Sequence, residues 1–225
     1  RSSARADQAA RLTAMQRRRI VVVAIAFLLA ASAAALILAG RESNPPRGLA
    51  YGLSGEQPAA FVDPRFLALK LTRARVQISW DLFTHRDLER FPGIADEQRR
   101  FAQWLVGARA AGISNVLLAF KASRDQPGRL PTRREYEAGV LKVLASVDAK
   151  GDRQMIDSIS PWNEPDLSSA TTARPFEAGQ LFSVIRRICR ERGCTALAGD
   201  FADSRFTAAY LSKYLAGAGA PMPLH

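Results

Sequence analysis

The chain has 225 residues, 48% apolar and 24% charged, a globular composition that excludes an intrinsically disordered protein. Two cysteines and two histidines are too few for a disulfide-built miniprotein and argue against a His/Cys zinc centre. Residues 1–19 carry +5 of the formal net charge of +11, and the +6 over residues 41–225 forms no basic stripe, so we expect no nucleic-acid partner.

The first forty residues have the pattern of a membrane signal anchor. Residues 20–39 are uncharged, and a helix of that length spans about 30 Å, the thickness of the hydrocarbon core. Three consecutive arginines precede this segment, and positive residues stay on the cytoplasmic side. We expect a cytoplasmic tail at 1–19, a single-pass span in the lipid bilayer at 20–39, and a stiff linker at 40–48 leading to an extracytoplasmic domain. A cleaved signal peptide is the alternative.

Residues 49–225 alternate short apolar strands with amphipathic helices. The expected strands are, in chain order, 49–53, 75–80, 115–120, 155–160 and 195–198. The expected helices begin at Asp63-Pro64, near Asp96, at Thr132, before Phe176 and near Ser204. Five βα units in series predict an α/β protein with a parallel sheet covered by helices.

Local signals predict several helix ends and faces. Asp63 suits a helix cap and Pro64 the first helical position. Thr132 and Glu135 have the spacing of a capping box. In the helix after the fourth strand, the residues expected to share the buried face are Phe176, Leu181, Ile185 and Ile188.

Two architectures fit this alternation, an open doubly wound sheet and a TIM barrel of eight βα units. The turn after the first expected strand reads Gly52-Leu53-Ser54-Gly55, without the G-x-G-x-x-G pattern of dinucleotide-binding sheets. No phosphate-cradling loop motif occurs either, so we expect no cofactor and no metal. In both architectures, functional residues gather at the carboxyl ends of the strands.

The fourth expected strand ends in the motif Ser160-Pro161-Trp162-Asn163-Glu164-Pro165. A carboxylic acid at a strand tip can protonate a departing glycosidic oxygen and then deprotonate the incoming water. The neighbouring amide of Asn163 can hydrogen-bond a sugar hydroxyl, and the face of Trp162 offers a platform for a pyranose ring. The alternative is an ordinary turn in which Pro165 stops the strand and Glu164 is solvated.

At this motif the sequence resembles clan A of the glycoside hydrolases, whose (βα)8 barrels carry an Asn-Glu pair after the fourth strand. In more detail it is similar to membrane-anchored, cellulase-like and xylosidase-like barrel proteins of high-GC bacteria. The segments that carry this likeness are 51–54, 63–66, 74–81, 160–165 and 198–201. The resemblance implies that Glu164 is the general acid/base and Asn163 the contact to the sugar 2-hydroxyl. It also implies a retaining mechanism with a second glutamate, the nucleophile, after a seventh strand.

The resemblance and the anchor together predict a function. We expect a membrane-anchored, extracytoplasmic glycoside hydrolase that acts on a poly- or oligosaccharide. Because only five of eight βα units are recognisable, we expect a truncated barrel that lacks the nucleophile and is inactive by itself. The alternative is a non-catalytic carbohydrate-binding or cell-wall scaffold protein on the same barrel. The sequence predicts no particular oligomeric state, sugar or linkage.

The remaining candidates each have two interpretations. Trp80 and Asp81 end the second expected strand, either as substrate contacts or as a core tryptophan and a turn aspartate. Asp200 either lines the cleft or caps the following helix. Lys121 either holds a hydroxyl or carboxylate or, as we expect, is an exposed loop lysine, and His85 is expected to be a solvated surface histidine.

The two cysteines are close in sequence, and we expect a structural disulfide rather than a catalytic role. Cys189 and Cys194 flank the end of a helix and the start of a strand. An exported domain folds in an oxidising environment, and a bridge requires Cα atoms about 4.4–6.8 Å apart.

Overall fold

Five parallel strands form one sheet whose order follows the chain. The computed structural model describes residues 51–202 and 206–219. Its strands are β1 (Gly52–Ser54), β2 (Arg73–Ser79), β3 (Asn115–Lys121), β4 (Ile156–Ser160) and β5 (Thr195–Ala196). Each strand pairs in parallel with the next, giving the order β1-β2-β3-β4-β5. The order of a doubly wound sheet reverses at a switch point, and these strands show no such reversal.

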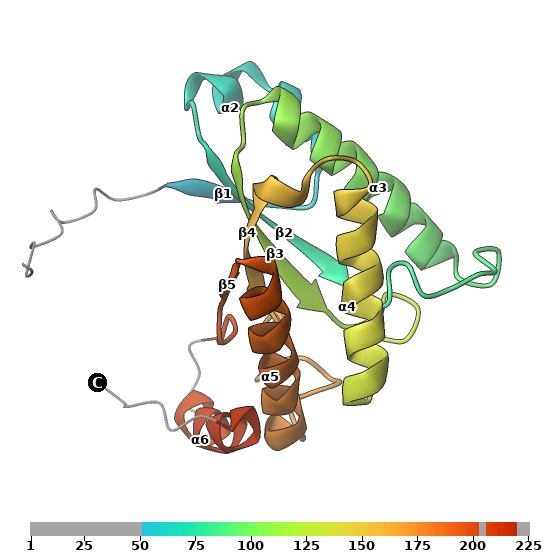
Figure 1. Cartoon of the computed structure of the whole chain (residues 1–225), viewed down its shortest axis with the longest axis vertical. Coiled ribbons are helices and arrows are strands. Elements are labelled where there is room, and N and C mark those ends of the chain that lie inside the picture. The colour runs from blue at the N-terminus through green and yellow to red at the C-terminus, as the bar shows by residue number, and fades with distance from the viewer. Residues whose placement is uncertain (1–50, 203–205, 220–225) are drawn as a thin grey trace, which may run out of the picture. The chain divides into compact units, whose positions relative to one another are not determined.

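Helical segments separate the strands. They are η1 (Pro58–Val62), α2 (Pro64–Ala68), α3 (Pro92–Ala110), α4 (Arg133–Asp148), η2 (Arg153–Met155), α5 (Pro175–Arg192) and α6 (Thr207–Ala218). The main helices α3, α4 and α5 lie along one face of the sheet (Figure 1). The described chain is therefore an α/β protein of five strand–helix units, an arrangement compatible with part of a βα barrel.

The alternation of side chains along the strands explains this layering. In β2, Val76 and Ile78 are buried in the core shared with the helices. Arg75 and Gln77, which alternate with them along the strand, point to the opposite face and are only half-buried. Because consecutive side chains of a strand point to opposite faces, one face of the sheet is apolar and the other is available for polar groups.

Two helix caps predicted from the sequence are confirmed. The Asp63 side chain accepts a hydrogen bond of 2.8 Å from the Arg65 amide at the start of α2. Thr132 and Glu135 form the reciprocal bonds of a capping box at the start of α4. The start of α3 was predicted too late, because Pro92 occupies the first helical position, where its missing N–H is not needed.

Phe176 was wrongly predicted to share the buried face of α5. It is 48% exposed, whereas Leu181, Ile185 and Ile188 are buried. Phe176 precedes Leu181 by five residues, a rotation of about 140° beyond a full turn of an α-helix. The other three follow the i, i+4, i+7 spacing that keeps side chains on one face.

The last helix packs against α5 through two glycines. A Cβ atom at Gly179 would overlap the carbonyl oxygen of Tyr214, and one at Gly217 would overlap that of Phe176. Phe182, Tyr210 and Tyr214 fill a second apolar cluster beside this crossing. The close approach of α5 and α6 therefore depends on residues without side chains.

The predicted membrane span at 20–39 lies outside the described residues, as do the tail at 1–19 and the linker at 40–48. Within 51–202 and 206–219, none of the helices has the length and apolar character needed to cross a membrane. The anchor stays a prediction from the sequence.

Candidate functional site

The Asn163-Glu164 pair follows β4, and its backbone is bonded to two other segments. The Asn163 amide donates to the Phe120 carbonyl oxygen at 2.7 Å, and the Glu164 amide donates to the Asp200 carbonyl oxygen at 2.8 Å. Asn163 and Asp200 also form a parallel bridge. Glu164 has a φ of 45°, in the left-handed region that disfavours a residue with a side chain. Strained backbone held in this way is frequent at functional sites.

The guanidinium of Arg75, on β2, orients the Asn163 side chain. Its Nη2 donates to Asn163 Oδ1 at 2.7 Å and to Asp200 Oδ2 at 2.6 Å, and its Nη1 donates to Ser54 Oγ at 3.2 Å. Because Oδ1 accepts from the arginine, the Nδ2 of Asn163 is left to donate to Glu164 Oε2, at 3.4 Å. We refer to Arg75, Asn163, Glu164 and Asp200 as the motif cluster.

Asp200 belongs to this cluster and does not cap a helix. Its carboxylate accepts from Arg75 and, at 3.3 Å, from Ser160 Oγ. The residue at the cap position of α6 is Phe206. The structure therefore does not support the helix cap, and Asp200 lies beside Asn163 at the strand ends without being one of the residues that line the cavity described below.

A second polar cluster surrounds Lys121 at the end of β3. Its Nζ lies 2.5 Å from Glu56 Oε1 and 3.5 Å from Glu97 Oε1. Glu97, on α3, is 3% exposed and accepts hydrogen bonds from the Ser79 amide at 3.1 Å and from Ser79 Oγ at 2.5 Å. We refer to Glu56, Lys121 and Glu97 as the lysine cluster. Lys121 was wrongly expected to be an exposed loop lysine, because two carboxylates hold it at the sheet edge.

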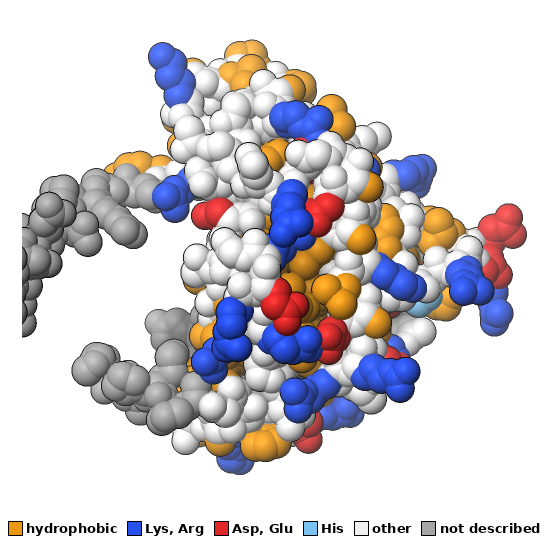
Figure 2. Space-filling view, viewed as in Figure 1, with side chains coloured by type: hydrophobic (Ala, Val, Ile, Leu, Met, Phe, Trp, Pro, Cys, Tyr) orange, Lys and Arg blue, Asp and Glu red, His pale blue; other side chains and the backbone are white. Residues whose placement is uncertain are grey.

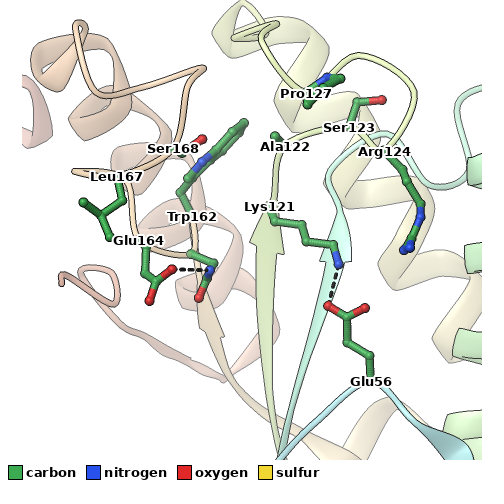
Figure 3. A pocket seen from close by; sticks show the side chains of 11 residues that line it. Glu56, Lys121, Ala122, Ser123, Arg124, Pro127, Trp162, Glu164, Leu167 and Ser168 are labelled. Carbon is green, nitrogen blue, oxygen red and sulfur yellow. Dashed lines mark hydrogen bonds and ion pairs between the residues drawn. The ribbon is translucent and has the colours of Figure 1, made fainter.

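One cavity of about 490 Å³ brings the two clusters together. Lys121 and Glu56 line it from β3 and the segment after β1, and Asn163 and Glu164 line it from the end of β4. Figure 3 shows Lys121 pointing toward Glu56, with Glu164 on the other side of the cavity. The cavity therefore contains two carboxylates, a lysine and an amide at the carboxyl ends of the strands, where parallel α/β proteins bind their ligands.

Trp162 does not provide the expected platform for a sugar ring. It borders the cavity, but its exposed fraction is 0%. Its ring lies against Tyr136, with centroids 6.5 Å apart. The Tyr136 hydroxyl donates to the Pro161 carbonyl oxygen at 2.5 Å, and burial raises the pKa of this phenol well above its usual value. Trp162 and Tyr136 thus pack in the core next to the motif and support it.

Trp80 and Asp81 are buried, and neither of them lines the cavity. Trp80 is 3% exposed and packs under Arg129, whose guanidinium carbon lies 5.5 Å from the ring centroid. Asp81 is 2% exposed, and its Oδ2 lies 2.8 Å from Nε2 of His85. His85 also lies against Phe91, with ring centroids 3.9 Å apart. His85 was wrongly expected to be a solvated surface residue.

Cys189 and Cys194 form a disulfide in the structure, with Cα atoms 4.6 Å apart. Gly193 ends α5 in the left-handed conformation, with a φ of 80°, and so reverses the chain between the two cysteines. The bridge joins the last turn of α5 to the segment that enters β5.

Sequence reasoning missed Arg75, Glu56 and Glu97. Arg75 had a usable signal, because it is a charged residue inside an otherwise alternating strand. Glu97 lies among polar residues at the start of α3, and only its burial distinguishes it from them. Glu56 comes from a short segment without a recognisable motif.

Within the described residues, no group of three or more His, Cys, Asp or Glu side chains is arranged to hold a metal ion. In the comparisons with known proteins, no family model, no curated protein and no solved structure matches this chain.

Proposed function

We propose that this protein is an extracytoplasmic glycoside hydrolase of the retaining type, anchored in the membrane by residues 20–39. The observation that carries the proposal is the Asn163-Glu164 pair at the end of β4, in a cavity at the carboxyl ends of parallel strands. The resemblance to clan A glycosidases, noted at the same residues, assigns roles to both.

The barrel is part of the proposal. Strands β1 to β5 are parallel and adjacent in chain order, which is how the strands of a βα barrel are wound. In a closed barrel the half-buried face that carries Arg75 and Gln77 would point to the interior. Eight strands would complete the ring, and the described residues contain five.

In the proposed mechanism, Glu164 donates a proton to the leaving oxygen and afterwards accepts one from the attacking water. Asn163 binds the hydroxyl beside the anomeric carbon through Nδ2, the end of the amide that Arg75 leaves available. The nucleophile would be a second glutamate after a seventh strand, as in the enzymes that the sequence resembles. A hydrogen bond to that hydroxyl can strengthen as charge develops on the ring, which accelerates the reaction.

The charges on the face shown in Figure 2 and in the cavity support a sugar rather than a polyanionic ligand. On the face shown in Figure 2, basic and acidic side chains are interspersed. The cavity itself is lined by Glu56 and Glu164 on the acidic side and by Lys121 and Arg124 on the basic side. These formal charges balance, which suits a neutral carbohydrate.

A carbohydrate-binding protein without catalysis is the second candidate. Glu56 is the carboxylate that shares the cavity with Glu164, but it is held in an ion pair with Lys121 and is therefore not free to act as a nucleophile. If no other carboxylate reaches the anomeric carbon, the same cavity would bind a sugar without cleaving it.

The test of the proposed function replaces Glu164 by Gln in the full-length protein, with the complete barrel, and measures the hydrolysis of a panel of aryl glycosides. We expect kcat to fall about 10²- to 10⁴-fold, the usual contribution of a general acid/base. The matched control is Glu89→Gln, at an exposed glutamate outside the cavity, and it should leave turnover unchanged. Unchanged hydrolysis by Glu164→Gln would overturn the assignment, and sugar binding without hydrolysis by the unmodified full-length protein would favour the second candidate.

A further inference from the structure

The lysine cluster contains one buried carboxylate, that of Glu97. Glu97 is 3% exposed, and both of its carboxylate oxygens accept hydrogen bonds from Ser79, one from the amide and one from the hydroxyl. The same carboxylate faces Lys121 Nζ at 3.5 Å. Because a buried carboxylate with fixed bonds cannot follow the lysine, Glu97 restrains where Nζ lies at the edge of the sheet.

Lys121 and Glu56 are more exposed and face the cavity. Their side chains are 23% and 32% exposed, and both line the space that Glu164 lines. An ammonium group has three N–H donors, of which one points to Glu56 and a second faces Glu97, leaving one for a ligand. Among the described residues, the hydrogen bonds of Glu56 involve Oε1, so that Oε2 can accept from a ligand.

A donor beside an acceptor matches a pair of neighbouring hydroxyl groups. One hydroxyl of a vicinal diol accepts from Lys121 Nζ while the adjacent one donates to Glu56 Oε2. Hydrogen bonds to charged groups of this kind are stronger than neutral ones. Ser123 also lines this cavity, and its buried Oγ has no hydrogen-bond partner in the described structure.

The charge of the cluster selects against anions. One ammonium group stands between two carboxylates, so the formal charge of the cluster is negative, whereas the formal charges of the cavity lining as a whole balance. A carboxylate or sulfate on the ligand would be repelled by Glu56, whereas a neutral polyol would not.

We propose that Glu56 and Lys121 form a diol-binding subsite for a neutral pyranose, located in the cavity opposite Glu164, with Glu97 as the residue that positions Lys121. This inference deepens the proposed function and rests on its carbohydrate ligand, but it does not require hydrolysis. It assigns the specificity for the hydroxyl pattern to the lysine cluster and the bond cleavage to the motif cluster.

The test measures binding rather than turnover. The full chain is titrated with methyl pyranosides of xylose, glucose, galactose and mannose, with their monodeoxy analogues, and with the corresponding uronides, and affinities are read by ligand-observed NMR. We expect the unmodified chain to bind one neutral pyranoside about 10- to 100-fold more tightly than one of its deoxy analogues, the factor that a hydrogen bond to a charged group contributes. It should also prefer that pyranoside to its uronide.

Four variants locate the source of this discrimination. Lys121→Met and Glu56→Gln should each reduce the ratio between the pyranoside and its deoxy analogue to near one. Arg124→Met removes a charge from the same cavity but outside the cluster, and it should keep the ratio. Since Lys121→Met leaves Glu97 without its cation, a Lys121→Met/Glu97→Gln double variant repeats the measurement without an unpaired buried carboxylate, and thermal unfolding checks each protein.

The possible outcomes distinguish the proposal of a diol-binding subsite from the proposal of a glycoside hydrolase. Loss of discrimination in Lys121→Met, with no hydrolysis by any form of the full-length protein, would support the subsite and overturn the proposed enzyme. Discrimination that survives both Lys121→Met and Glu56→Gln would overturn the subsite even if Glu164→Gln stops turnover. Tighter binding of the uronide, or no binding of any pyranoside to the unmodified chain, would overturn it as well.

Discussion

The two sides of the cavity are held by different means. The motif cluster is fixed through its main chain, since the amides of Asn163 and Glu164 bond to Phe120 and to the carbonyl of Asp200. The lysine cluster is held mainly through side chains, from the segment after β1, from β3 and from α3, and one main-chain amide, that of Ser79, bonds to Glu97. Residues adjacent in sequence can be held by one segment of strained backbone. Side chains that come from three different elements depend on ion pairs to stay together. We therefore expect the motif side to be rigid and the lysine side to adapt to a ligand.

The largest effect is expected from Arg75→Met, which removes the side chain that links the motif cluster. It leaves Asp200 without its cation and Asn163 Oδ1 without its donor. Breaking a buried pair costs about 3–5 kcal/mol, and because the Asp200 side chain is 34% exposed we expect about 2–3 kcal/mol. Denaturant unfolding measures the change. Arg73→Met, at an exposed arginine of the same strand, is the matched control, and an equal loss in both variants would show that Arg75 has no special structural role.

A smaller effect of opposite sign is expected from Glu164→Gly. A left-handed backbone costs a residue with a side chain about 1–2 kcal/mol, so glycine should raise the free energy of unfolding by about 1 kcal/mol while abolishing hydrolysis. Lys70, with a φ of 49°, is the matched control, because Lys70→Gly relieves the same conformation outside the cavity. Both variants should gain stability in thermal unfolding, and only Glu164→Gly should lose activity. A loss of stability in Glu164→Gly would mean that its side chain stabilises the turn.

The smallest effect concerns Tyr136, which supports the motif from the core. Burial raises its pKa, so the unfolded chain loses this proton at a lower pH than the folded chain does. Stability is therefore unaffected below about pH 10 and falls as the pH rises above it, because ionisation favours the unfolded state. At pH 10 the ionisation of one such tyrosine in the unfolded chain lowers the free energy of unfolding by roughly 0.4 kcal/mol.

Denaturant unfolding at pH 8 and pH 10, with the unmodified chain and with Tyr136→Phe, measures how much of this loss of stability is due to Tyr136. The variant should lose less stability between the two pH values, although Tyr210 and Tyr214, whose pKa values are also raised by burial, still contribute. Equal losses in both proteins would contradict a buried, protonated Tyr136.

Local signals explain why much of the fold could be predicted. Strand β2 follows from apolar alternation, β3 and β4 follow from short apolar segments, and the caps at Asp63 and Thr132 follow from residues next to the helices they begin. The Asn163-Glu164 pair was recognisable because its residues are contiguous. The errors arose where a local pattern was incomplete, as for Phe176, which is apolar but lies off the buried face of α5.

The sequence alone determined the α/β alternation, the helix caps and the position of the motif at the end of β4, because these depend on residues within a few positions of one another. Only the tertiary structure decided which partners the motif has. Arg75 and Asp200 are 125 positions apart and meet because the strand order β1 to β5 brings their ends together. Packing in three dimensions also decided that Trp80 and Trp162 are buried and that Glu97 faces Lys121. Side-chain burial depends on all the elements that surround a residue, and no local pattern contains that information.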